Sequence, residues 1–69
     1  MDDNGVGKRI KEEIKERGTT QKEVAKDARI SRSYLHGIKA GIFDPSVKTV
    51  VRIANALRTS FDYLRWGKK

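Results

Sequence analysis

Only two residues, Arg29 and Ile30, separate two short stretches with helical patterns, residues 20–28 and residues 31–41. A connection this tight does not let two short helices lie side by side, so it forces them to cross steeply. This steeply crossed pair is the strongest constraint that the chain places on its fold.

The first helix of the pair opens with a capping box. Thr20 is followed three residues later by Glu23, and we expect the helix to run through Ala28. Its buried side is predicted to consist of the small residues Val24, Ala25 and Ala28. A helix with such small buried residues allows a second helix to pack close against it.

The second helix has Ser31 as its predicted N-cap and Gly41 as its left-handed stop. Leu35 and Ile38 are three residues apart, as a buried helical stripe requires. Gly37 lies between them, although glycine costs about 1 kcal/mol relative to alanine in a helix interior. The chain therefore weakens this helix at a position that needs an explanation.

Another helix is predicted over residues 6–17, because Val6, Ile10 and Ile14 recur every four residues and Gly18 follows. The charged residues between these apolar positions are expected on a solvated face; they are Lys8, Arg9, Lys11, Glu12, Glu13, Lys15 and Glu16.

A fourth helix is predicted after Pro45, with Ser46 as its cap and one wide apolar face at the centre of the core. That face is expected to comprise Val47, Val50, Val51, Ala54 and Leu57.

A short last helix is predicted between its cap Ser60 and Gly67, with Phe61 and Leu64 facing inward. Trp66 is expected either to cover the bottom of the core or to lie at a subunit contact. The chain is therefore predicted to be all-α, a compact five-helix domain over residues 1–69 with its core at about residues 6–67.

Composition narrows the class of protein. The chain has 69 residues and no cysteine, so neither disulfides nor a common Cys/His metal site is expected. It also has a single histidine and no apolar run long enough to span a membrane. We expect a soluble cytoplasmic protein that is not an enzyme and needs no cofactor.

The excess positive charge is unevenly distributed. Residues 1–28 carry seven basic and seven acidic side chains, whereas residues 29–69 carry nine basic side chains against Asp44 and Asp62. An excess of this kind favours a negatively charged partner such as nucleic acid. The same excess also has a plainer interpretation, which is solubility.

The helix capped by Ser31 has a distinctive outward side. Because Leu35 and Ile38 are buried, the outward positions are predicted to be Arg32, Ser33, His36, Gly37 and Ala40. In a major groove, the guanidinium of Arg32 is suited to donate hydrogen bonds to guanine O6 and N7. Ser33 is suited to bond a base or a phosphate, and His36 to donate to guanine N7 or to approach a thymine methyl group. Gly37 and Ala40 are expected to leave the ridge bare, so that the backbone approaches the DNA closely.

The segment "QKEVAKDARISRSYLHGIKAG" (residues 21–41) resembles the helix-turn-helix of the phage repressor/Cro family, also called the XRE family. The tail "TSFDYLRWG" (residues 59–67) is similar to the closing segment of that family. The resemblance implies a DNA-binding regulator in which Gln21, assisted by Thr20, grips a phosphate. Lys39, Lys48 and Arg52 are placed to hold the opposite strand. The predicted DNA contacts are Thr20, Gln21, Ser31, Arg32, Ser33, Tyr34, His36, Gly37, Lys39 and Lys48.

The resemblance also implies a homodimer on a palindromic operator, with half-sites one helical turn apart, roughly 34 Å. The predicted dimer residues are Arg58, Thr59, Phe61 and Trp66. This sequence departs from the family at two positions. Arg29 stands where the family often has glycine, which implies strain at positive φ or a variant turn. Gly37 stands where the family often has a base-reading side chain.

Several alternatives remain open at this point. Gly37 could be the C-cap of its helix, and Arg32 and His36 could be ordinary solvated residues. The chain could be an antitoxin-like protein that clasps a partner protein and binds DNA for autoregulation. It could also bind DNA or RNA through charge alone, without sequence preference.

Overall fold

The computed structural model describes residues 5–68, and in this range the chain is all-helical with no strand. The helices are α1 (Val6–Arg17), α2 (Gln21–Ala28), α3 (Arg32–Lys39), α4 (Val47–Ala56) and α5 (Phe61–Trp66). The all-α five-helix expectation is confirmed. None of the helices within residues 5–68 has the length and apolar character needed to cross a membrane.

Each predicted cap is present. The hydroxyl of Thr20 accepts a hydrogen bond from the Glu23 backbone N–H at 3.1 Å. Ser31, Ser46 and Ser60 likewise cap α3, α4 and α5 through the backbone N–H three residues later. These bonds satisfy donors that the first turn of a helix otherwise leaves without a partner.

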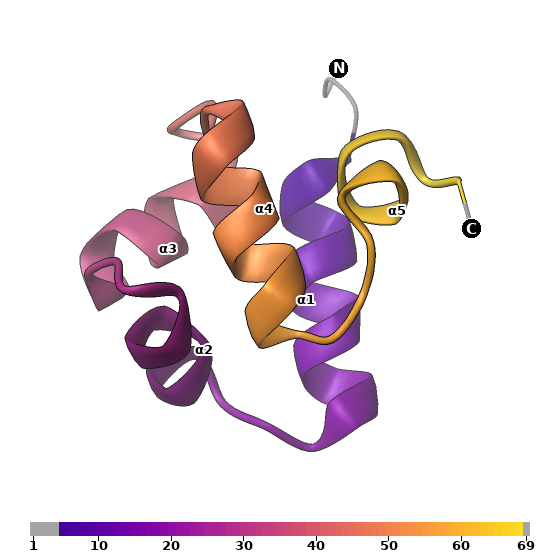
Figure 1. Cartoon of the computed structure of the whole chain (residues 1–69). Helices are drawn as coiled ribbons and strands as arrows, with labels where there is room; N and C mark the ends of the chain where they lie inside the picture. The colour runs from indigo at the N-terminus through magenta and orange to yellow at the C-terminus, as the bar shows by residue number, and fades with distance from the viewer. Residues whose placement is uncertain (1–4, 69) are drawn as a thin grey trace.

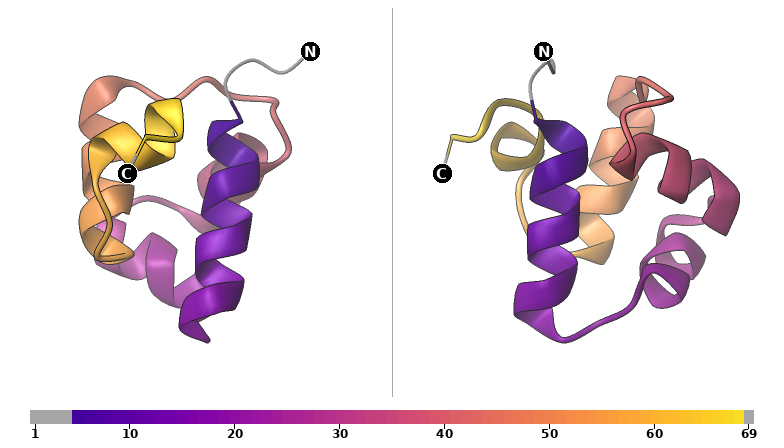
Figure 2. Two further views of the ribbon diagram at one scale, coloured as in Figure 1. Left: turned by 90° about the vertical axis from the view of Figure 1, so that its right-hand side faces the viewer. Right: turned by 180° about the vertical axis from the view of Figure 1, so that it is seen from behind.

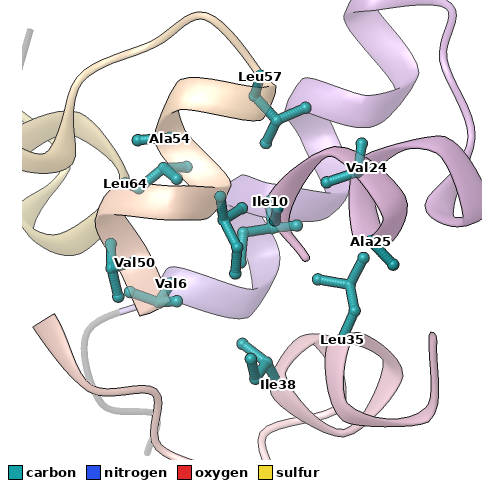
Figure 3. Close-up of a cluster of buried hydrophobic side chains, with 12 residues drawn as sticks. Val6, Ile10, Val24, Ala25, Leu35, Ile38, Val50, Ala54, Leu57 and Leu64 are labelled. Carbon is teal, nitrogen blue, oxygen red and sulfur yellow. The ribbon is translucent and has the colours of Figure 1, made fainter. Parts of the chain in front are cut away.

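The helices enclose one core. In Figure 1 α4 and α1 lie in the middle, with α3 on one side of this pair and α5 on the other, and the view from behind in Figure 2 shows the same order. Figure 3 shows Ile10 of α1 in the middle of the cluster, between side chains of α4 and α5 and those of α2 and α3. The buried apolar residues are Val6, Ile10, Val24, Ala25, Ala28, Leu35, Ile38, Val50, Ile53, Ala54, Leu57 and Leu64.

The expected apolar face of α4 was partly wrong. Val47 and Val51 are exposed, and Ile53, which was not predicted, is buried. With 100° of turn per residue, the buried stripe centres on Val50, Ile53, Ala54 and Leu57, and both exposed valines lie toward one edge of it. The apolar pattern of α4 is therefore wider than the surface that its neighbours cover.

Two charged residues of α1 do not lie on a solvated face. Arg9 donates from Nε to the Leu64 carbonyl at 2.9 Å and from Nη2 to the Arg65 carbonyl at 3.0 Å. These bonds hold the end of α5 against α1, because terminal carbonyls of a helix lack intrahelical donors. Glu13 is buried and pairs with Arg17 at 3.1 Å.

In the turn between α2 and α3, Arg29 stands where the family often has glycine, and it adopts the left-handed conformation that favours glycine. Arg29 has φ 62° and ψ 43°, and the Ile30 backbone N–H donates to the Ala25 carbonyl at 3.0 Å. A left-handed conformation costs a residue with a Cβ about 1–2 kcal/mol. The turn therefore tolerates strain at Arg29 and does not use a variant geometry.

Candidate nucleic-acid interface

The exposed side of α3 matches most of the prediction. Leu35 and Ile38 are buried against the core, whereas Arg32, Ser33, His36 and Ala40 are exposed. At 100° per residue these four positions fall within an arc of about 100° on one side of the helix. We call them the α3 ridge. Their outward orientation is confirmed, and their contact with DNA stays a prediction.

Gly37 is not part of this ridge, and the expectation of a bare backbone there was wrong. Gly37 is buried, and a Cβ built at this position would overlap the ring of Phe43. Its carbonyl also accepts the backbone N–H groups of Ile42 and Phe43, at 2.8 and 3.2 Å. Glycine is needed because the loop after α3 folds back onto the helix at this point. Since α3 continues to Lys39, Gly37 is not its C-cap either.

The opposite edge of the ridge is bordered by the start of α2. The Gln21 side chain donates from Nε2 to the Arg32 carbonyl at 3.4 Å, and its Oε1 accepts from Lys39 Nζ at 2.6 Å. Gln21 thus links the first turn of α2 to both ends of α3. Lys39 was expected to hold the opposite DNA strand, but it lies on the Gln21 side of α3.

Lys39 also lies in an unusual electrostatic environment. Burial of its ammonium group, and secondarily the positive charge of Lys11, lower the pKa of Lys39 below its ordinary value. Both causes disfavour the charged form. A negative charge beside this ammonium group would favour its charged form.

The other predicted DNA contacts occupy the rim of the ridge or lie outside it. The hydroxyls of Thr20 and Ser31 accept backbone N–H groups as N-caps. Tyr34 is half-buried, and its ring centroid is 5.7 Å from that of Phe43. Lys48 is exposed in the first turn of α4, outside the helix pair.

No carboxylate lies on α3, whose sequence is RSYLHGIK. The only acidic residues of the chain after position 28 are Asp44, whose carboxylate is 3.4 Å from the Arg65 guanidinium, and Asp62, in the first turn of α5. The ridge therefore presents positive and neutral groups without an acidic neighbour on the same helix.

The predicted dimer residues lie around α5. Arg58 is exposed with φ 56°, Thr59 is half-buried, and Phe61 packs partly against the core. Trp66 does not cover the core, because it is 56% exposed, and the Arg65 guanidinium lies 5.3 Å from its ring centroid.

Two short, capped helices joined by a three-residue turn, Arg29 to Ser31, define a helix-turn-helix domain. Residues 10–64 match the helix-turn-helix family. The chain belongs to this family, and the resemblance inferred from residues 21–41 is confirmed.

Among the similar proteins are one from a Bacillus phage and one from Bacillus subtilis. The chain is 46% identical over 52 residues to the immunity repressor protein of Bacillus phage phi105, a match that covers 75% of this chain and 36% of that protein. The N-terminal DNA-binding domain of SinR from Bacillus subtilis superposes with a TM-score of 0.83 at 30% identity, covering 90% of this chain and 91% of that one. The chain in a structure of the SinR/SinI complex gives a TM-score of 0.80 at 32% identity, covering 86% and 58%. The present chain thus spans about a third of the length of the phage repressor.

Proposed function

We propose that this chain is a sequence-specific DNA-binding transcriptional regulator that acts as a repressor. In this proposal α3 enters the major groove of a specific site and the α3 ridge reads base edges. The protein acts in the cytoplasm and is a binding protein, not an enzyme. The similarity to a phage immunity repressor supports the repressor role.

The observation that carries the proposal is the arrangement of Arg32, Ser33 and His36. They are exposed together on α3, and the helix N-terminus that precedes them is ordered by the Ser31 cap. Arg32 lies in the first turn, which is the part of a recognition helix closest to the base edges. Its forked guanidinium suits the paired acceptors of guanine.

Phosphate contacts orient the domain in this proposal without reading sequence. Gln21, Lys39 and the first-turn backbone N–H groups of α2 form a cationic edge beside the ridge. A helix N-terminus favours an anion because its N–H groups and dipole point toward it. Lys48 contacts a phosphate farther along the duplex.

A single helix-turn-helix reads only a few base pairs, so the operator is proposed to be palindromic and bound by a homodimer. The surface around α5, with Arg58, Thr59, Phe61 and Trp66, is the proposed contact between the two copies. Exposure of Trp66 supports this assignment, because exposed aromatic residues are enriched at protein interfaces.

The test is selection of bound sites from random DNA by the wild type and by Arg32→Ala. We expect the wild type to select one motif and Arg32→Ala to lose preference at a single base pair, with a cost of about 1–3 kcal/mol at that base pair. Lys15→Ala is the matched control, because it removes one positive charge from exposed α1 and leaves the ridge intact. Its selected motif should be unchanged.

A wild type that selects no motif would refute sequence-specific binding. Equal weakening of all sequences by Arg32→Ala would instead indicate a basic protein that binds nucleic acid through charge alone.

A second candidate function is that of an interaction protein, similar to an antitoxin, which clasps a partner protein and uses DNA binding for autoregulation. The similarity to a chain of the SinR/SinI complex and the exposed Trp66 favour it. If the wild type co-purifies with one partner protein in fixed stoichiometry and Trp66→Ala does not, this second function is favoured over the first.

A further inference from the structure

Phe43 is a large apolar side chain held in place on the surface. Phe43 is 48% exposed although one side of its ring lies against Gly37 and the ring of Tyr34 is 5.7 Å away. The neighbouring backbone is fixed as well, because the N–H groups of Ile42 and Phe43 both donate to the Gly37 carbonyl. An exposed ring with this much local support is preorganised for contact, since little conformational freedom remains to be lost on binding.

The position of Gly37 shows where the ring lies relative to the α3 ridge. Around the helix axis, Gly37 is about 40° from Ser33, 60° from Ala40 and 100° from His36, all in one direction. Tyr34 lies about 60° away in the other direction. The Phe43 ring therefore stands between Tyr34 and the ridge, and it borders the edge formed by Ser33 and Ala40.

The two edges of the ridge consequently differ in chemistry. Gln21 and Lys39 make one edge polar and cationic. Phe43 together with the methyl group of Ala40 makes the other edge apolar. In the major groove the C5-methyl of thymine is the apolar group that distinguishes one base from the others, and alanine and phenylalanine side chains are suited to contact it.

We infer that Phe43, seated on Gly37, reads a thymine by contact with its C5-methyl group at the apolar edge of the ridge. This inference rests on the proposed function, because it requires α3 to lie in the major groove. It assigns a specificity-determining role to a loop residue outside the helix-turn-helix. It also explains why Gly37 carries no side chain, since the space beside it is occupied by the ring that makes the contact.

The experiment replaces thymine by uracil, which removes only the methyl group. Each thymine of the motif selected by the wild type is replaced in turn, and affinity is measured by fluorescence anisotropy. We expect the wild type to lose about fourfold in affinity at one thymine of each half-site, which is the effect of one buried methyl group. Phe43→Ala should bind thymine and uracil equally at that position.

Two further variants identify the group that touches the methyl. His36→Ala should retain the discrimination between thymine and uracil at that position. Gly37→Ala should lose it, because the new Cβ displaces the ring while Phe43 itself remains. Circular dichroism melting of each variant separates a lost contact from a lost fold.

The inference is supported if Phe43→Ala no longer discriminates thymine from uracil at that position and His36→Ala still does. Retention in Phe43→Ala, or a wild type that selects a motif but is indifferent to uracil at every position, overturns the inference and leaves the proposed function standing. A wild type that selects no motif overturns both.

Discussion

At the scale of single residues, Gly37 shows how a local cost can serve a tertiary contact. Glycine weakens α3 by about 1 kcal/mol relative to alanine. The loop after α3 nevertheless requires it, because both the Phe43 ring and two backbone N–H groups close onto this position. The sequence shows the cost of Gly37, and only the structure shows the ring that accounts for it.

The contact between Gly37 and Phe43 predicts strong coupling in a double-mutant cycle. In the Phe43→Ala background, Gly37→Ala should raise the free energy of unfolding by up to about 1 kcal/mol, because alanine favours the helix. In the wild type this gain should be cancelled or reversed, since the Cβ displaces the ring. Urea denaturation of the four proteins should thus give a coupling energy of about 1 kcal/mol. Additive effects would mean that the ring does not lie against Gly37.

At the scale of elements, the side chain of Gln21 joins α2 to α3 beside the ridge. It donates to the Arg32 carbonyl and accepts from Lys39 Nζ. The sequence assigned Gln21 and Lys39 to different strands of the DNA, because residues 18 positions apart cannot be paired from local spacing. The contact shows that the two side chains lie together at one cationic edge of the ridge.

This edge predicts that DNA affinity depends on pH through Lys39. Burial and the charge of Lys11 lower its pKa, so Lys39 loses its proton below 10.5, the ordinary lysine value. Only the protonated form attracts a phosphate, so affinity should fall as the pH rises through the lowered pKa, by roughly fivefold, because an ion pair near the surface contributes up to about 1 kcal/mol. Lys39→Arg should show no such fall, because arginine stays charged.

The measurement is a pH titration of affinity for one duplex by wild type and Lys39→Arg in parallel. Comparison of the two proteins removes any effect of pH on the DNA itself. Identical pH profiles would show that Lys39 does not approach a phosphate.

At the scale of the whole molecule, the two proposed binding surfaces are separated by the core. In Figure 1 α3 lies on one flank of α1 and α4, and α5 lies on the other. A dimer formed through α5 would therefore leave the α3 ridge of each copy accessible to DNA. This separation allows the two functions to be tested independently.

Trp66→Ala tests the proposed homodimer. If two copies meet through α5, this variant should lower affinity for a full palindrome by about tenfold or more, which is the scale expected when a tryptophan at the centre of an interface is truncated. Its affinity for a single half-site should be unchanged, whereas Arg32→Ala should weaken binding to both duplexes. Equal binding of wild type and Trp66→Ala to the palindrome would place the dimer contact elsewhere.

Local spacing in the sequence was enough to predict the helices. Thr20, Ser31, Ser46 and Ser60 all cap the helices assigned to them, and Gly18, Gly41 and Gly67 all have the positive φ expected where a helix stops. These features depend on residues a few positions apart, so they can be read from local spacing. The short connection between α2 and α3, Arg29 to Ser31, was readable from the sequence in the same way.

Which of the outward positions are free depends on tertiary packing. Packing places the Phe43 ring on Gly37 and Lys39 against Gln21. It also places Arg9 against the end of α5 and leaves Val47 and Val51 exposed. Each of these outcomes depends on what a distant or separately folded segment covers, and periodicity along one helix does not contain that information. The candidate site was thus predictable as a helix face, and its two chemically different edges were not.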